Sequence, residues 1–330
     1  MHPLEKHWQR FTWVSLLLIP LSALFACVSG LRRFAYRCGL LQRHRLPVPV
    51  IIVGNISVGG TGKTPAVLWL AQALRERGRN PGIVSRGYGG SGQLMAVGND
   101  SDPAEVGDEP ALLASRTDCP VVIGRDRVAA ARLLLSGNAG IDVILSDDGL
   151  QHYRLGRDVE IALIDGRRGT GNGWLLPAGP LRERTWRLQS VDAIVTNGSM
   201  SLKSSVPTFN MDLKGALLHK LRDTASTRAI ESFAGKPLHA LAGIGDPQRF
   251  FDQLRQAGLS IHAHPFADHH RFTAADLEFG DDLPVIMTEK DAIKCRSFAR
   301  DHWWMLPVDA QIDPGLADLV NQKITQSRGR

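Results

Sequence analysis

The sequence of 330 residues contains only four cysteines, and they do not form a recognisable motif. No two of them make a CxxC pair. A zinc site and a disulfide framework both depend on paired or closely spaced cysteines, so neither is indicated. The pattern fits a protein of the reducing cytosol. The four residues are Cys27, Cys38, Cys119 and Cys295.

The chain also lacks a long run of lysine or arginine and a basic strand interleaved with aromatic residues. Its net charge of +6 and pI of about 9.3 are mildly basic, which suits anionic lipid, nucleotide or nucleic acid alike. Without a concentrated basic patch, nucleic acid is not expected as a partner. Apolar residues make up 43% and charged residues 22%, which is ordinary for a globular protein of one large or two modest domains.

No charged residue occurs between Phe11 and Leu31. About 20 apolar residues span a bilayer, so this stretch just qualifies, although Pro20 and several serines interrupt it. We interpret it as a membrane-associated helix that either spans the bilayer or lies in its interface. A buried core helix is the alternative, and no small-x-small motif favours a cleaved signal peptide. The arginines that follow would face anionic headgroups on the cytoplasmic side; they are Arg32, Arg33, Arg37, Arg43 and Arg45.

After Pro47 the chain alternates short apolar runs with helical patterns. The continuous apolar run Val48–Val53 predicts a buried strand, and a helix is expected from Lys63 to Arg77. Uninterrupted apolar strands are typical of a parallel sheet that helices cover on both faces. Further strands are expected at 82–85, 121–123, 143–146, 160–164 and 193–196, with a helix at 126–135.

Between the first strand and the first helix lies the glycine-rich motif SVGGTGKT. This is the context of a P-loop, whose backbone N–H groups and lysine hold phosphates while its last hydroxyl binds Mg²⁺. Ser57 stands where the common pattern has glycine. We expect ATP to bind here, with Lys63 on the transferred phosphate and Thr64 on the metal. The nucleotide-binding residues are Ser57, Val58, Gly59, Gly60, Thr61, Gly62, Lys63 and Thr64.

Two acidic pairs are candidates for the chemistry next to this loop. Asp147 and Asp148 follow an apolar strand, where a carboxylate would hold Mg²⁺ directly or through water; a solvated turn is the alternative. Asp108 and Glu109 precede a helical pattern, and on local evidence they are equally explained as a helix cap.

The segment HAHPFADHH, which ends at His270, concentrates four histidines. A metal site, a solvated loop and a catalytic histidine paired with a carboxylate all remain open for it. The nearby segment Gly243–Arg249 follows a strand and opens a helix. It lacks the third glycine of a dinucleotide fingerprint, so a second nucleotide site is not expected.

Two α/β lobes are expected. The helical and strand patterns weaken around 201–223 and resume at Leu238, ending with a helix near Leu316–Ile324. We therefore divide the chain into a membrane-associated helix with a basic flank at 1–45, a P-loop lobe with a parallel sheet at 46–204, a β linker at 205–225 and a smaller α/β lobe at 226–330.

The motifs taken together resemble one family. GNISVGGTGKTP, SRGYGG, VGDEP, LSDDGLQHYRL, LLPAGPLRE, AGIGDPQRFF, FADHHRF and TEKDAIK, in this order, are similar to those of the tetraacyldisaccharide 4′-kinases of lipid A biosynthesis. The resemblance runs from about residue 10 to residue 310. The P-loop is shared with many ATPases, whereas LPAGPLRE, DDGLQH and DHH are far more selective.

The resemblance implies an activity, a fold and a location. Family members transfer the γ-phosphate of ATP to the 4′-hydroxyl of a tetraacylated glucosamine disaccharide 1-phosphate, which gives lipid IVA. They need Mg²⁺, act at the cytoplasmic face of the Gram-negative inner membrane, and have a P-loop lobe and a smaller α/β lobe with the active site between them. A lipid substrate and the membrane are therefore expected as partners. Separately from the resemblance, we expect a monomer.

The resemblance also assigns roles to residues. Asp108 matches the catalytic acid of the family and His269 its partner, while Lys63 would neutralise charge on the transferred phosphoryl group. Thr64, Glu109, Asp147 and Asp148 fall among the Mg²⁺-related positions. Arg182 and Arg249 are candidate contacts for phosphate or substrate, with a structural ion pair as the alternative.

A P-loop switch ATPase that acts by dimerisation is the main alternative class. Such proteins usually carry a lysine early in the loop, where this chain has Ser57 and Val58, and the pair Asp108 and His269 has no purpose in them. A dinucleotide oxidoreductase would leave Lys63 and Thr64 unexplained.

Overall fold

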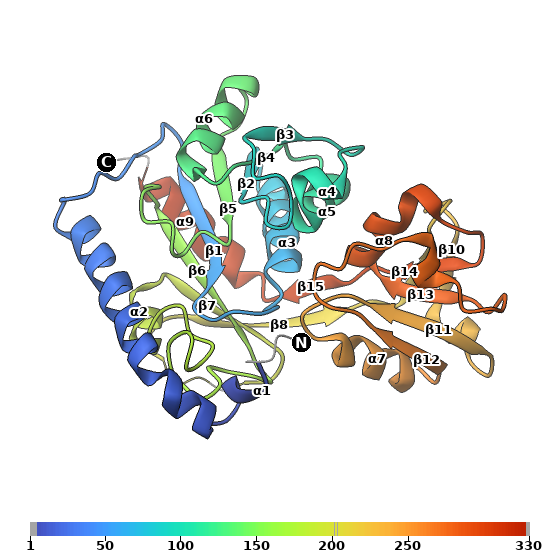
Figure 1. The fold of residues 1–330 in the computed structure, drawn as a ribbon. Coiled ribbons are helices and arrows are strands. Elements are labelled where there is room, and N and C mark those ends of the chain that lie inside the picture. Colours follow the sequence, from blue (N-terminus) through green and yellow to red (C-terminus); the bar gives the residue numbers. More distant parts are fainter. Residues whose placement is uncertain (1–4, 201, 203, 328–330) are drawn as a thin grey trace.

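The computed structural model describes residues 5–200, 202 and 204–327, so the expectations for residues 1–4, 201, 203 and 328–330 lie outside the described residues. In the described part the strands form two sheets, each in its own lobe, and the lobes lie side by side (Figure 1). The larger sheet has the order β15-β8-β7-β6-β1-β5-β2-β4-β3, and the smaller has β10-β9-β14-β13-β11-β12. The predicted α/β class is confirmed.

The larger sheet is parallel through its centre, because β8, β7, β6, β1, β5, β2 and β4 all pair in parallel. Every residue of β1 is buried, as an apolar strand covered on both faces requires. Its strands are β1 (Val50–Asn55), β2 (Pro81–Ser85), β3 (Met95–Val97), β4 (Val121–Ile123), β5 (Val143–Asp147), β6 (Val159–Asp165), β7 (Ala193–Asn197), β8 (Thr208–Lys214) and β15 (Asp309–Ile312).

Helices cover both faces of this sheet. Alternate residues of β1 point to opposite faces, so Ile51 joins one hydrophobic cluster and Ile52 the other. The first cluster includes α3, α5 and α9, and the second includes α6. The helices of the larger lobe are α3 (Lys63–Glu76), α4 (Pro103–Val106), α5 (Asp108–Arg116), α6 (Arg127–Gly137) and α9 (Gly315–Ser327), with a 3₁₀ helix at Thr185–Ser190.

The smaller sheet is parallel through β14, β13, β11 and β12, and β9 pairs antiparallel with β14 and β10. Its strands are β9 (Leu217–Lys220), β10 (Thr227–Ala229), β11 (Pro237–Ala242), β12 (Ser260–Pro265), β13 (Val285–Thr288) and β14 (Trp303–Leu306). Its helices are α7 (Pro247–Gln256) and α8 (Glu289–Cys295), with 3₁₀ helices at Ile230–Phe233, Ala274–Leu277 and Arg296–Phe298.

The prediction that residues 226–330 form only the smaller lobe is wrong at its end. After β14 the chain returns to the larger lobe, where β15 pairs with β8 and α9 packs beside α3 (Figure 1, dark red). The physical reason is the apolar face of α9: Leu316, Val320 and Ile324 are buried in the core of the larger lobe. The predicted linker at 205–225 is also divided, because β8 belongs to the larger sheet and β9 to the smaller one.

Within the described residues, the chain therefore crosses between the lobes twice, between β8 and β9 and between β14 and β15. The two crossings touch. A Cβ atom added to Gly215 in the first would lie 2.4 Å from the carbonyl oxygen of Pro307 in the second, so only glycine allows this approach.

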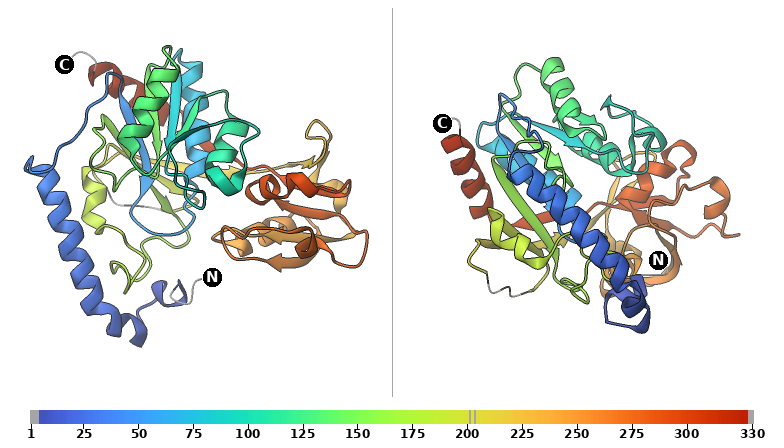
Figure 2. Two further views of the ribbon diagram at one scale, coloured as in Figure 1. Left: turned by 45° about the horizontal axis from the view of Figure 1, so that its top comes forward. Right: turned by 60° about the vertical axis from the view of Figure 1, so that its left-hand side comes forward.

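The N-terminal segment forms α1 (Glu5–Trp8) and α2 (Trp13–Arg37), and α2 runs along the larger lobe (Figure 2). By length and composition α2 is apolar enough to cross a membrane. Its polar side faces the protein: Ser15 and Ser22 are buried, and the Ser22 hydroxyl donates a 2.8 Å hydrogen bond to the carbonyl of Leu175. Because its apolar side chains are exposed, α2 is not the buried core helix considered as an alternative.

Candidate active site

The glycine-rich motif Ser57–Thr64 connects β1 to α3 at the carboxyl edge of the larger sheet. Gly59 and Gly62 have φ of 98° and 87°, in the left-handed region that favours glycine. At Gly62 a side chain would also collide with Met211, whose Cε lies 2.7 Å from the position of an added Cβ. The loop thus turns its backbone around an open space at the N-terminus of α3, as a phosphate-binding loop requires.

Three side chains of the larger lobe hold this loop. The Asn55 amide donates to the Thr61 hydroxyl at 3.3 Å, and the Asn197 amide donates to the Thr61 carbonyl at 3.2 Å. The Arg168 guanidinium donates to the carbonyl of Gly60. Asn197 ends β7, and Arg168 follows β6. Sequence reasoning identified neither residue, because they lie far from the motif in the chain.

Asp147 ends β5, beside β1, and Asp148 is the next residue. The carboxylate of Asp148 lies 3.7 Å from Nζ of Lys63 and accepts hydrogen bonds of 3.0 and 3.1 Å from Arg182. Burial acts to raise the pKa of Asp148, but Lys63 and Arg182 outweigh it and lower the pKa to about 2. Arg182, a predicted contact of phosphate or substrate, is thus an ion-pair partner of Asp148 here.

The environment of Asp147 is the opposite. Its carboxylate is fully buried, and Oδ2 accepts a 3.2 Å hydrogen bond from Ser85. Its Oδ1 has no hydrogen-bond partner among the described residues. Burial, with the negative charges of Glu109 and Asp148, raises the pKa of Asp147 to about 7. The pKa values of the two adjacent carboxylates therefore differ: Asp148 forms ion pairs with Lys63 and Arg182, whereas for Asp147 burial and negative neighbours outweigh the charges of Lys63 and Arg127.

Asp108 and His269 meet across the two lobes. Asp108 begins α5 in the larger lobe, and His269 lies after β12 in the smaller lobe; their Oδ2 and Nδ1 atoms are 3.1 Å apart. Burial acts to raise the pKa of Asp108, but the His269 hydrogen bond and the nearby Lys294 and Lys290 lower it. The neighbouring Glu109 lies 3.3 Å from Nζ of Lys290. The fold thus brings together a carboxylate and an imidazole that the family resemblance paired.

Asp148 and His269 share a backbone feature. Their φ angles are 47° and 61°, and in the described part of the chain they are the non-glycine residues with positive φ. Such conformations cost about 1–3 kcal/mol each and concentrate at functional sites. Both residues belong to the predicted site, so this strain supports the assignment independently of the motifs.

The donor set around Asp147 fits a magnesium ion. A hard divalent cation would pair with the unpartnered Oδ1 of Asp147 and relieve its repulsion from Glu109 and Asp148. Thr64, buried at the start of α3, supplies a hydroxyl. Among the described residues no three His, Cys, Asp or Glu side chains converge on one point. Mg²⁺ is usually held by one or two carboxylates with water and substrate phosphates, so it does not need such a cage.

The other predicted basic contact, Arg249, lies on α7 and donates a 2.9 Å hydrogen bond to Asn197, the residue that holds Thr61. It therefore reaches the phosphate loop through another side chain. The sequence analysis assigned no role to Lys290 and Lys294. Both belong to the motif TEKDAIK, which could have identified them as candidate site residues.

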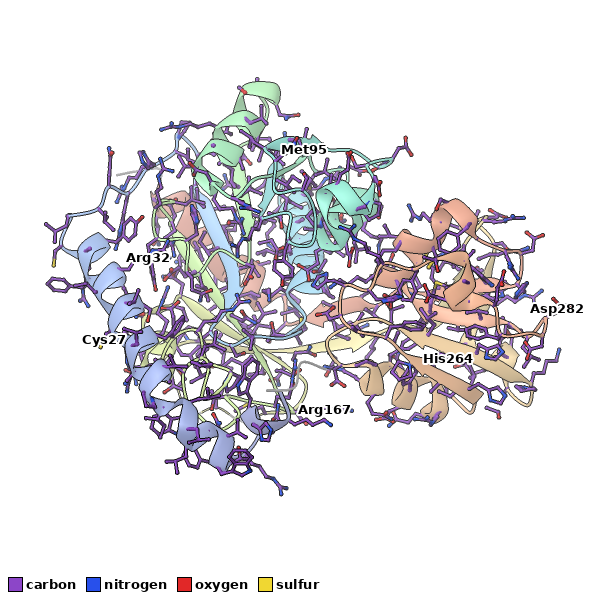
Figure 3. All side chains as sticks on the ribbon, in the orientation of Figure 1. Cys27, Arg32, Met95, Arg167, His264 and Asp282 are labelled. Atoms are coloured by element: carbon purple, nitrogen blue, oxygen red, sulfur yellow. The ribbon has the colours of Figure 1, made fainter. Side chains whose placement is uncertain are left out.

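His270 follows His269 and lies 3.4 Å from Asp276, whereas His262 and His264 on β12 lie apart from this site. His264, labelled in Figure 3 on the smaller lobe, is 2.8 Å from His239, which in turn is 3.1 Å from Asp281 (between Nε2 and Oδ1). His239 thus forms hydrogen bonds with both His264 and Asp281. No metal-binding group was found among the described residues, so the metal interpretation of this segment gains no support.

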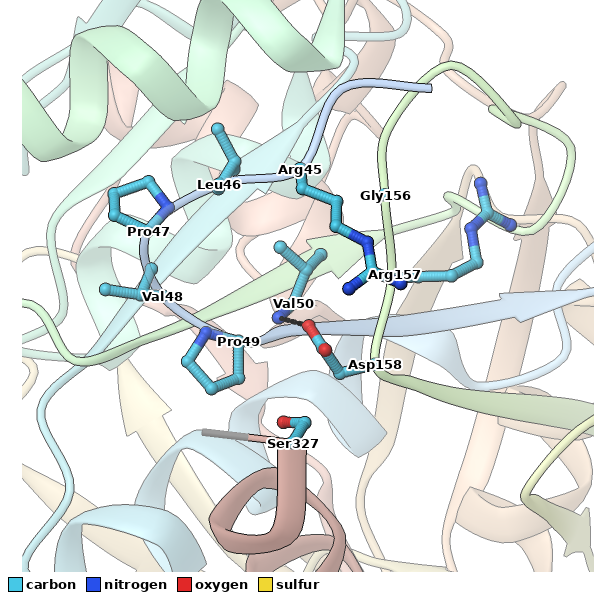
Figure 4. A pocket seen from close by; sticks show the side chains of 10 residues that line it. All are labelled: Arg45, Leu46, Pro47, Val48, Pro49, Val50, Gly156, Arg157, Asp158 and Ser327. Carbon is cyan, nitrogen blue, oxygen red and sulfur yellow. Dashed lines mark hydrogen bonds between the residues drawn. The ribbon is translucent and has the colours of Figure 1, made fainter. Parts of the chain in front are cut away.

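A cavity of about 210 Å³ lies between the lobes beside the phosphate loop. Its lining includes the loop residues 57–59 and 61, Trp8, Arg168, Gly245 and Asp268. A second cavity, of about 240 Å³, lies at the opposite end of β1, where Asp158 accepts the backbone N–H of Val50 (Figure 4). Only the first cavity adjoins the predicted site residues.

The fold and the site define a nucleotide-dependent enzyme of the P-loop class, in which a second lobe completes the site. The chain matches the family model "Tetraacyldisaccharide-1-P 4'-kinase" over residues 14–325, so it belongs to the tetraacyldisaccharide 4′-kinase family.

Similar proteins agree with this membership. The tetraacyldisaccharide 4′-kinase of Methylobacillus flagellatus is 52% identical, over 98% of this chain and 96% of its own, and that of Aromatoleum aromaticum is 51% identical over 97% of each chain. The crystal structure of LpxK from Aquifex aeolicus in complex with ATP superimposes with a TM-score of 0.82 at 29% identity. That match covers 94% of this chain and 99% of the Aquifex chain.

Proposed function

We propose that this protein transfers the γ-phosphate of ATP to the 4′-hydroxyl of a tetraacylated glucosamine disaccharide 1-phosphate and so forms lipid IVA. The observation that carries the proposal is the contact between Asp108 and His269 across the lobes, beside a complete phosphate loop. Family membership supports the acceptor, and the similar Aquifex protein in complex with ATP supports the donor.

In this mechanism the larger lobe holds the donor. The backbone N–H groups of 57–62 and the ammonium of Lys63 bind the phosphates, and Lys63 stabilises negative charge on the transferred group. When bound, Mg²⁺ supplies further neutralisation of phosphate charge. Asp147 and Thr64 would hold it, with Glu109 and Asp148, whose charges act on Asp147, as further candidate residues.

Asp108 handles the proton of the acceptor. The 4′-hydroxyl oxygen attacks the γ-phosphorus while its proton passes to the carboxylate of Asp108, and ADP leaves with the bridging oxygen. His269 holds this carboxylate by a 3.1 Å hydrogen bond. It also compensates for part of the change in charge when the carboxylate accepts the proton. The two lobes thus have separate tasks: the larger binds the nucleotide, and the smaller completes the base.

The test is a direct assay. The protein is incubated with ATP, Mg²⁺ and detergent-dispersed disaccharide monophosphate lipid, and the lipid is examined by mass spectrometry for the addition of one phosphate. Formation of that product, dependent on both ATP and lipid, is expected. Intact nucleotide binding without any phosphorylated lipid would refute the proposal.

We further propose that α2 lies in the interface of the cytoplasmic leaflet of the inner membrane rather than across the bilayer. The middle of α2 is bonded to the larger lobe at Ser22, and near the C-terminal end of the helix Arg33 approaches Glu183 at 3.7 Å. A helix attached along its length to a polar lobe cannot cross the bilayer without taking that lobe with it. The exposed apolar side chains are Phe11, Trp13, Leu16, Leu17, Leu21, Leu24, Val28, Leu31 and Phe34.

The two ends of α2 distinguish these orientations. Cys27→Ser leaves Cys38, exposed after the last turn, to report one end, and Arg10→Cys with Cys27→Ser and Cys38→Ser reports the other. In sealed anionic vesicles with protein added outside, an impermeant maleimide should label both ends from the outside. Protection of the Arg10→Cys position alone would indicate a spanning helix and contradict the interfacial orientation.

A further inference from the structure

A buried chain of alternating charges runs from the core of the smaller lobe to Asp108. It begins at Asp291, whose side chain is completely buried at the start of α8. Its Oδ1 lies 2.8 Å from the ammonium of Lys294, which lies in turn 3.6 Å from Oδ2 of Asp108. All three side chains are at most 10% exposed.

The smaller lobe fixes the position of Asp291. Its Oδ2 accepts hydrogen bonds from the backbone N–H of Gly243 at 2.9 Å and from the hydroxyl of Thr288 at 2.6 Å. Lys294 is enclosed on another side by the ring of Phe272, with Nζ 4.8 Å from its centroid. A lysine held by a fixed carboxylate and an aromatic face has little freedom to move.

At Asp108, the His269 hydrogen bond and the Lys294 ion pair both fall on the same oxygen, Oδ2. Among the described residues, His269 and Lys294 are the partners with which this carboxylate forms a hydrogen bond or an ion pair. Two charged or polar groups on one oxygen fix the plane of the carboxylate and leave Oδ1 for the acceptor hydroxyl. Both groups come from the smaller lobe, whereas Asp108 belongs to the larger.

We propose that Lys294, fixed by Asp291, is a positioning residue that orients the carboxylate of Asp108 toward the acceptor hydroxyl. This inference rests on the proposed kinase function. It explains a buried lysine and a buried aspartate that contact neither the phosphate loop nor the acids at Asp147 and Asp148. Buried ion pairs add little net stability, so a role in orientation accounts for this pair better than a role in folding.

The test removes both buried charges together, because Lys294→Met alone would leave Asp291 without a counter-ion. In Lys294→Met/Asp291→Asn, the asparagine can still accept the hydrogen bonds from Gly243 and Thr288. Misplacing a reacting group by about 1 Å costs about 100-fold in rate, so kcat should fall by about that factor. The KM for ATP and the melting temperature should stay close to those of the wild type.

Arg116→Gln is the matched control. Arg116 of α5 pairs at 2.6 Å with Glu289 of α8, so it links the same two helices at a distance from Asp108. Its kcat should change less than about twofold. An equal loss of kcat in Arg116→Gln would mean that Lys294 only docks the lobes and would overturn the proposal. A double variant that keeps at least half of the wild-type kcat, or that loses ATP affinity in parallel with kcat, would overturn it as well. Failure of the kinase function itself would show as a wild-type protein that makes no lipid product.

Discussion

The two lobes of this protein hold their charged residues in different ways. In the larger lobe Asp148 pairs with both Lys63 and Arg182, and Asn55 and Asn197 fasten the phosphate loop from the same sheet. The smaller lobe instead holds Lys290 and Lys294 between a carboxylate of its own and a carboxylate of the larger lobe. Most contacts that hold the phosphate loop therefore come from one lobe, with Arg249 adding an indirect contact through Asn197, whereas the pair of Asp108 and His269 needs both lobes.

The boundary itself explains how this dependence is maintained. The chain crosses it at two touching points, and α8 lies against α5, where Arg116 joins Glu289. His269, Lys290 and Lys294 all project from the smaller lobe toward the acids at the start of α5. A displacement of the lobes would separate Asp108 from His269 and would also break the hydrogen bond from Arg249 to Asn197.

The largest expected effect comes from separating these two tasks by mutation. Asp108→Asn should lower kcat by about 10³-fold, because a general base contributes about 10²–10⁴-fold, while ATP affinity stays unchanged. Lys63→Met should lower kcat by about 10²–10³-fold and also weaken ATP binding, because its charge acts on the bound phosphates. Steady-state kinetics and nucleotide titration of both variants measure this contrast.

His269→Ala provides the control from the other side of the boundary. Like Asp108→Asn, it should keep its affinity for ATP, because His269 contacts Asp108 rather than the phosphate loop. If Asp108→Asn or His269→Ala weakened ATP binding as much as Lys63→Met, the division of tasks between the lobes would be wrong.

Much of the larger lobe could be predicted from local patterns. Continuous apolar strands such as Val143–Asp147 and the glycine-rich turn before Lys63 are dictated by residues close together in the chain. The return of β15 and α9 to the larger sheet could not be predicted this way. The periodicity of α9 shows that it has an apolar face, but not which of two α/β lobes that face covers.

The same limit applies to the candidate site. The motifs identified Asp108, His269 and the acids at 147 and 148 as candidates. The family resemblance then paired Asp108 with His269 and linked the other acids to Mg²⁺. The contrast in pKa between Asp147 and Asp148 could not be predicted, because it depends on burial and on Lys63 and Arg182 forming ion pairs with Asp148. The role of Lys294 was missed because its contact with Asp108 joins residues of different lobes that are far apart in the chain.

A smaller effect should appear in the stability of the larger lobe. The pKa of Asp147 is about 7 in the folded protein, above its ordinary value of 3.8. Between these values the folded state binds the proton that the unfolded state has lost. The contribution of Asp147 to the free energy of unfolding of the metal-free protein should therefore decrease as the pH rises from about 4 to about 7. Urea denaturation in the presence of EDTA measures this slope.

The matched variant for this slope is Asp147→Asn, which cannot lose a proton. Burial lowers the pKa of His152 to about 4, below its ordinary value of 6.5, so His152 contributes an opposite slope, with stability lost as the pH falls through this range. That contribution is present in both proteins, so the quantity to compare is the difference in unfolding free energy between wild type and Asp147→Asn. This difference should shift in favour of the variant as the pH rises toward 7. A difference that does not change with pH would mean that Asp147 is already ionised at low pH and that the two adjacent carboxylates are alike.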